Sequence, residues 1–119
     1  MQLRFLQKNK EEKDMIIAIA GSGGKTTRVH KLAQYYRSLG KKVFVTTTTH
    51  MKKESDTVIP ENIEDIRKQL NETGYCMAGM PATSEDASVQ KIGPLPEDFY
   101  ETGIKEADIT LIEADGSRG

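Results

Sequence analysis

A glycine-rich turn between an apolar run and an amphipathic segment constrains this chain more than any other feature. Met15–Ala20 is continuously apolar, which is typical of a strand buried on both faces. The turn that follows, Gly21–Gly24, contains three glycines, which let the backbone bend sharply and approach a ligand with no Cβ in the way. Lys25 then opens a predicted helix whose unpaired N–H groups point back at the turn and favour an anion. The sequence therefore predicts a phosphate-binding turn.

The side chains around this turn suit the phosphates of a nucleotide and a bound magnesium ion. The Lys25 ammonium can reach the outer phosphates, and the Thr26 hydroxyl suits a phosphate-bound Mg²⁺. The residues that we expect to bind the nucleotide here are Gly21, Ser22, Gly23, Gly24, Lys25, Thr26 and Thr27. The strict motif has glycine six residues before the lysine, where Ile19 stands. The shorter form resembles the phosphate loop of Mur-type ATP-dependent ligases. The structural alternative is a strand-to-helix turn with an incidental lysine.

Length and composition exclude several classes of protein. A chain of 119 residues is expected to form one domain, residues 1–119, with a core of its own. The formal net charge of −1 creates no field that would attract nucleic acid, so we expect no such partner. One cysteine, Cys76, cannot form an internal disulfide, and no apolar run approaches the length of a membrane span. We therefore expect a cytoplasmic protein with no membrane association and a buried structural thiol.

The residues after the turn predict an α/β fold. Apolar side chains recur at helical spacing from Lys25 to Leu39, and Gly40 is a natural stop because it adopts a left-handed conformation at little cost. The β-branched run Val43–Thr49 then predicts a second strand. Two strands joined by one helix make a unit whose strands are parallel and whose crossover is right-handed. We expect a mostly parallel sheet with flanking helices, similar to the three-layer, Rossmann-like P-loop NTPases.

Four more elements are expected further along the chain, separated by one long loop. They are a helix after Pro60 with the proline in its first turn, a third strand at Tyr75–Met80, a helix at Glu97–Glu106 and a fourth strand at Asp108–Glu113. The loop is predicted at Pro81–Pro96, which holds three of the four prolines, and we expect it to lie over the site. An open sheet also favours a homo-oligomer that pairs through the sheet edge.

Acidic residues follow the fourth predicted strand. Ligands of open α/β sheets bind beyond the carboxyl ends of the strands, so a parallel fourth strand would bring Glu113 and Asp115 to the phosphate turn. Phosphate-loop enzymes need a carboxylate there to hold Mg²⁺. We expect Asp115 first and Glu113 second as metal ligands besides Thr26, and Lys25 and Asp115 as the catalytic residues. Asp-Gly is also a common turn pair, which is the structural alternative.

A run of threonines ends the second predicted strand at the same edge. Thr46 and Thr47 are expected to be strand-forming residues, because threonine favours strands. Thr49 and His50 lie at the strand exit, where they could contact the γ-phosphate, Mg²⁺ or an acceptor group. His50 and the other histidine, His30, have no Cys/His cluster around them, so a zinc site is not expected.

Three strings in their order resemble one bacterial family. Gly-Ser-Gly-Gly-Lys-Thr-Thr, Thr-Thr-Thr-Thr-His-Met and Glu-Ala-Asp-Gly-Ser-Arg-Gly are similar to segments of the selenium-dependent hydroxylase accessory proteins, also called YqeC-type proteins. Lys-Ile-Gly-Pro-Leu-Pro at residues 91–96 is similar too. The resemblance covers 15–119. It implies a nucleotide-binding factor that assists maturation of selenium-dependent molybdenum hydroxylases, with such a hydroxylase or its maturation factors as partner. Family members are about twice as long, so we expect this chain to match their N-terminal half.

Three functions remain open on the sequence alone. The first is a protein that binds ATP or GTP with Mg²⁺ and hydrolyses it or transfers a phosphoryl or nucleotidyl group. The second is an ATP-dependent small-molecule kinase or Mur-like ligase, which the shorter phosphate loop favours. The third is a scaffold or chaperone whose nucleotide site is a switch without turnover.

Overall fold

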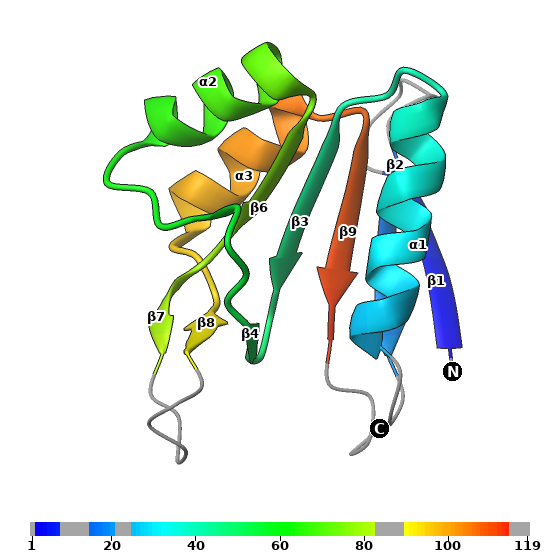
Figure 1. The fold of residues 1–119 in the computed structure, drawn as a ribbon, viewed down its shortest axis with the longest axis horizontal. Coiled ribbons are helices and arrows are strands. Elements are labelled where there is room, and N and C mark those ends of the chain that lie inside the picture. The colour runs from blue at the N-terminus through cyan, green and yellow to red at the C-terminus, as the bar shows by residue number, and fades with distance from the viewer. Residues whose placement is uncertain (1, 8–14, 21–24, 83–89, 115–119) are drawn as a thin grey trace.

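A six-stranded sheet with helices on both faces forms the body of the protein (Figure 1). The computed structural model describes residues 2–7, 15–20, 25–82 and 90–114. The order across the sheet is β1-β2-β9-β3-β6-β5. These strands are β1 Gln2–Gln7, β2 Met15–Ala20, β9 Ile109–Glu113, β3 Val43–Thr47, β6 Tyr75–Ala78 and β5 Thr57–Val58. All neighbours pair in parallel except β1, which lies antiparallel to β2. The predicted α/β fold with a mostly parallel sheet is confirmed.

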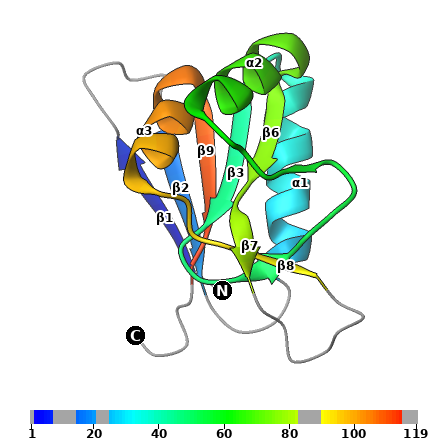
Figure 2. The same cartoon turned by 90° about the vertical axis from the view of Figure 1, so that its left-hand side faces the viewer.

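The helices divide between the two faces of the sheet (Figure 2). Helix α1, Lys25–Ser38, covers one face, while α2, Ile63–Thr73, and α3, Glu97–Glu106, cover the other. Each face has its own apolar core, because alternate residues of a buried strand point to opposite sides. On the α1 side the core residues include Ile17, Ile19, Val29, Ala33, Val43, Val45, Met77, Ile109 and Leu111. On the other side they include Phe44, Ile66, Leu70, Cys76, Ala78, Ile104 and Ala107.

An extended connection replaces a helix between β3 and β5. Residues 48–56 cross the α1 side of the sheet and contain the short strand β4, Met51–Lys52. This strand pairs with β8, Lys91–Gly93, which in turn pairs with β7, Met80–Ala82. The resulting three-stranded sheet lies beyond the carboxyl ends of β3 and β6 (Figure 1). It is anchored by Met51 and Ile92, which are both buried in the core on the α1 side.

Several predicted elements match the observed ones. Met15–Ala20 is β2, the helix predicted from Lys25 ends one residue early at Ser38, and α3 spans the predicted residues. Gly40 and Gly74 have φ angles of 81° and 77°, so both adopt the left-handed conformation in which glycine is favoured. The strand predicted at Asp108–Glu113 is β9, which begins one residue later.

Other predictions were wrong in ways that have physical causes. Strand β3 ends at Thr47, two residues before the predicted end, because the chain turns there to enter the smaller sheet. Helix α2 begins at Ile63 rather than with Pro60 in its first turn, because Asn62 and Asp65 form a capping box. The predicted third strand is interrupted after Ala78.

Besides the short strands β4 and β5, two segments contain strands that the sequence did not predict. Gln2–Gln7 pairs with the edge of β2 as strand β1. The segment 81–96, predicted as a loop, contributes to β7 and β8, although residues 83–89 lie outside the described part of the chain. Strands of two or three residues show no periodicity of their own, and their stability comes from distant partners.

Candidate phosphate and metal site

The carboxyl ends of three adjacent strands form the candidate site. In the parallel register, Glu113 of β9 lies between Ile19 of β2 and Thr47 of β3. Strand β2 leads into the glycine-rich turn, and β9 leads into the acidic string. Because β9 is the immediate neighbour of β2, the carboxyl ends of these two strands lie side by side at one edge of the sheet (Figure 1).

Hydrogen bonds hold the three strand ends together. The Ala114 amide donates to the carbonyl oxygen of Ile19 at 2.9 Å. The carbonyl oxygen of Glu113 accepts from the Thr47 hydroxyl at 2.8 Å and from the Thr48 amide at 3.2 Å. These hydrogen bonds therefore fix, relative to one another, the positions at which the chain leaves β2, β9 and β3.

Glu113 belongs to the face of the sheet that carries α1. Ile109 and Leu111 pack in the core on the α1 side, and Glu113 continues their alternation two residues further. Its side chain is buried, with 5% of the residue exposed. The N-terminus of α1, where an anion is favoured, begins on this same face. This placement suits a carboxylate that acts on a metal ion bound to a phosphate.

Thr46 and Thr47 are buried strand residues, as predicted, but one of them also shapes the strand exit. The Thr46 hydroxyl donates to the carbonyl oxygen of Ala78 at 2.9 Å on the α2 side. The Thr47 hydroxyl donates to Glu113 and accepts from the Thr49 amide at 3.1 Å. Thr47 therefore connects the carboxyl end of β9 to the residues that follow β3. The sequence prediction missed this role, because the register of Thr47 with Glu113 arises only in the folded sheet.

Thr49 and His50 lie beyond the end of β3, between the main sheet and the smaller one. Thr49 is half-buried and His50 is exposed. The smaller sheet approaches them closely at Gly93, where an added Cβ would lie 3.6 Å from both the Thr49 carbonyl oxygen and the His50 Cδ2. Gly93 therefore lies against the strand exit, a placement that the sequence analysis did not assign.

The remaining predicted site residues are only partly described. Five of them lie outside the described residues: Gly21, Ser22, Gly23, Gly24 and Asp115. Lys25 and Thr26 begin α1, but their side chains are not described. Thr27 is exposed in the first turn of the helix. Within residues 2–7, 15–20, 25–82 and 90–114, no group of three His, Cys, Asp or Glu side chains could hold a metal ion. Asp115, which we expect to be the first metal ligand, is not among these residues.

The two notable residues away from this edge have ordinary structural environments. Cys76 in β6 is fully buried, as predicted, and burial raises the pKa of its thiol to about 12. His30 in α1 forms a hydrogen bond between its Nε2 and the Glu54 Oε2 at 2.8 Å. None of the helices in the described ranges combines the length and apolar character that crossing a bilayer requires.

Comparison with known protein families supports the resemblance seen in the sequence. The family model described as "YqeC protein" matches residues 17–119, which is most of the chain. The chain belongs to the YqeC family. It is also 29% identical over 119 residues to the uncharacterized protein YqeC of Escherichia coli K12, in a match that covers 92% of this chain and 43% of that protein.

A second relative fits the fold. The chain is 30% identical over 105 residues to the signal recognition particle 54 kDa protein of Hyperthermus butylicus, covering 88% of this chain and 21% of that protein. This similarity fits a P-loop NTPase-like fold and, with the family membership, is compatible with nucleotide binding. The chain spans less than half the length of either relative. No solved structure matches it significantly.

Proposed function

We propose that this domain binds a nucleoside triphosphate with Mg²⁺ at the carboxyl edge of β2 and β9. The observation that carries the proposal is the register of Ile19 with Glu113, which sets the end of the acidic strand beside the strand that enters the glycine-rich turn. Gly21, Ser22, Gly23, Gly24, Lys25, Thr26 and Thr27 would surround the phosphates.

The donor groups at this edge fit magnesium. Mg²⁺ prefers oxygen ligands and is commonly bound by one or two carboxylates together with phosphates and water. Glu113 supplies a buried carboxylate on the α1 side, Thr26 is the second residue of α1, and Asp115 follows β9 in the sequence. Asp115 would hold the ion directly or through water, with Glu113 beside it. A bound Mg²⁺ would neutralise charge on the phosphates, while Lys25 and the helix N-terminus stabilise the charge that develops in transfer.

The chemistry that we propose is nucleotide hydrolysis or transfer of a phosphoryl or nucleotidyl group. Its biological setting would be the maturation of selenium-dependent molybdenum hydroxylases, which the resemblance of the three sequence strings supports. A hydroxylase or one of its maturation factors would then be the partner. The preference for ATP or GTP would depend on contacts to the base, away from the carboxyl ends of β2, β9 and β3.

Ligand-dependent stability tests the binding assignment. A ligand at about 100 times its dissociation constant adds about 2.7 kcal/mol to the free energy of unfolding. We expect Mg²⁺ with ATP or with GTP to stabilise the parent chain and to have little effect on Lys25→Ala. Lys31→Ala, which removes an exposed lysine elsewhere on α1, is the matched control and should respond like the parent. Absence of a shift with both nucleotides in the parent chain would reject the assignment.

A kinase or ligase is the second candidate, and the smaller sheet favours it. Strands β4, β8 and β7 form a platform next to Thr49 and His50, where an acceptor could lie near the γ-phosphate. The alternative is a switch that binds nucleotide without turnover. Formation of nucleoside diphosphate that requires an added acceptor, and that falls in His50→Gln with nucleotide binding unchanged, supports the kinase or ligase. Binding of nucleotide without formation of the diphosphate, with or without acceptors, supports the switch.

A further inference from the structure

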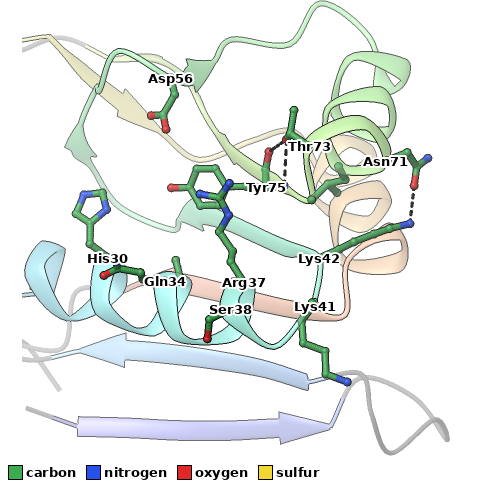
Figure 3. Close-up of a pocket in the computed structure, with 14 residues that line it drawn as sticks. His30, Gln34, Arg37, Ser38, Lys41, Lys42, Asp56, Asn71, Thr73 and Tyr75 are labelled. Atoms are coloured by element: carbon green, nitrogen blue, oxygen red, sulfur yellow. Dashed lines mark hydrogen bonds between the residues drawn. The ribbon is translucent and has the colours of Figure 1, made fainter.

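A groove of about 820 Å³ lies along α1, away from the strand ends that form the candidate phosphate site (Figure 3). His30, Gln34 and Arg37 line it from the helix, and Tyr75 at the start of β6 forms part of its floor. The groove exists because the connection from β3 to β5 is extended where a helix would have covered the sheet. Its volume falls within the range of small-molecule sites.

Cross-wall contacts fix the two ends of the groove. His30 on α1 is bonded to Glu54 on the extended connection at 2.8 Å. At the other end, the Lys42 ammonium donates to Asn71 Oδ1 at 2.8 Å, as Figure 3 shows. The connection is itself held at its turn, because the Glu54 amide donates to the Thr57 hydroxyl at 2.8 Å. The groove therefore has walls that are joined to each other at both ends.

Groups of opposite charge flank the phenol at the bottom of this groove. The Arg37 guanidinium lies over the Tyr75 ring, with its Cζ 4.6 Å from the ring centroid. Figure 3 shows Arg37 reaching from α1 to Tyr75, with Asp56 on the other side of the ring. Within the described part of the chain, neither Arg37 nor Asp56 takes part in an ion pair. Lys41 also lines the groove, but its ammonium points away from Tyr75 and Asp56 in the same view.

Tyr75 stays a hydrogen-bond donor at neutral pH. Burial raises the pKa of its phenol well above the ordinary value, and the carboxylates of Asp56 and Glu54 raise it further. The groove therefore offers three distinct groups: a planar cation, a protonated hydroxyl and a carboxylate. The Arg37 guanidinium is already held against a ring, so it loses little freedom on pairing with a carboxylate or a phosphate.

We propose that this groove is a second ligand site, which binds a small zwitterionic organic molecule through Arg37 and Asp56. The anionic group of the ligand pairs with Arg37, and its ammonium group pairs with Asp56. The phosphates of a nucleotide at the glycine-rich turn do not occupy this site. Arg37 comes twelve residues after Lys25 on the same helix, which places it about 18 Å further along the axis at 1.5 Å per residue.

The test is a ligand-observed NMR screen with size-matched sets of zwitterionic, anionic, cationic and neutral fragments. We expect zwitterions to dominate the hits, with affinities that fall about tenfold or more in Arg37→Gln and in Asp56→Asn, because each variant removes one charge-assisted pair. Lys41→Gln is the matched control and should bind like the parent, since its ammonium points elsewhere. Equal hit rates for the four sets, or affinities unchanged in both variants, would overturn the proposal.

Melting temperatures distinguish ligand binding by Arg37 and Asp56 from a purely structural role of the two charges. If Arg37 and Asp56 served only to neutralise each other, both substitutions would lower the melting temperature and leave fragment binding unchanged, which would also overturn the proposal. Both residues are exposed, so we expect both variants to fold. The site is independent of the proposed nucleotide site, so Lys25→Ala should retain zwitterion binding even where its nucleotide binding is lost.

Discussion

Replacing Thr47 by valine tests whether its hydroxyl organises the candidate site in addition to stabilising the sheet. The change keeps the shape and strand preference of the side chain and removes a hydroxyl that makes two hydrogen bonds. Each such bond contributes about 0.5–1.5 kcal/mol, so Thr47→Val should lower the free energy of unfolding by about 1–3 kcal/mol. The Glu113 carbonyl oxygen keeps its bond from the Thr48 amide, which favours the lower half of that range.

Thr46→Val is the matched control. Thr46 is as deeply buried, but its hydroxyl donates a single bond, to Ala78 on the opposite side of the sheet. We expect a loss of about 0.5–1.5 kcal/mol. For a domain of this length, 1 kcal/mol corresponds to about 4 °C in melting temperature. Thr47→Val should therefore melt about 2 °C below Thr46→Val, and Thr47→Ser should recover most of the difference.

Binding assays complete this comparison. We expect Thr47→Val to weaken Mg²⁺–nucleotide binding measured by calorimetry, because the Thr49 amide and the Glu113 carbonyl lose their shared partner at the strand exit. Thr46→Val should bind like the parent. If both variants lose the same stability and bind nucleotide equally well, Thr47 has no organising role, and the reasoning fails.

Three further predictions concern the core and its helices. Gly103→Ala should lower the free energy of unfolding by about 1–3 kcal/mol in denaturant titrations, because the added Cβ would lie 2.3 Å from the buried Phe44 ring. A smaller loss in a Phe44→Leu background supports this cause, and an equal loss contradicts it. Asn62→Ala should cost about 1 kcal/mol by removing the cap that bonds the Asp65 amide, and a change within error would contradict the assignment. Burial raises the pKa of the Cys76 thiol from 9.0 to about 12, so the stability that the neutral thiol contributes is fully present below pH 9 and is lost as the pH rises towards 12. In urea titrations, the free energy of unfolding of Cys76→Ala should therefore fall less steeply with pH than that of the parent. Equal slopes would refute this prediction.

The elements that position the site could be predicted because their signals are local. Met15–Ala20 is apolar throughout, and the helix from Lys25 repeats its apolar residues at helical spacing and ends before a left-handed glycine. A parallel sheet then requires the carboxyl ends of its strands to share one edge, which is why Glu113 was expected near the phosphate turn. The observed register with Ile19 agrees with that expectation.

The features that the sequence did not predict depend on distant partners. Strand β4 has two residues and forms because Met51 pairs with Ile92, about forty residues later in the chain. The hydroxyl of Thr47 acquires its role only when β9 lies alongside β3. The groove at Tyr75 likewise follows from the absence of a helix between β3 and β5, which local spacing in residues 48–56 did not reveal.

Calorimetric titration of nucleotide with and without Mg²⁺, on the parent chain and on Asp115→Asn, tests the central claim most directly. We expect the parent chain to bind ATP or GTP more tightly when Mg²⁺ is present. Asp115→Asn should lose this gain while keeping its affinity for the metal-free nucleotide, because the phosphate turn is intact. A parent chain that binds neither nucleotide, or a variant with the same gain from Mg²⁺ as the parent, would contradict a metal–phosphate site at this edge of the sheet.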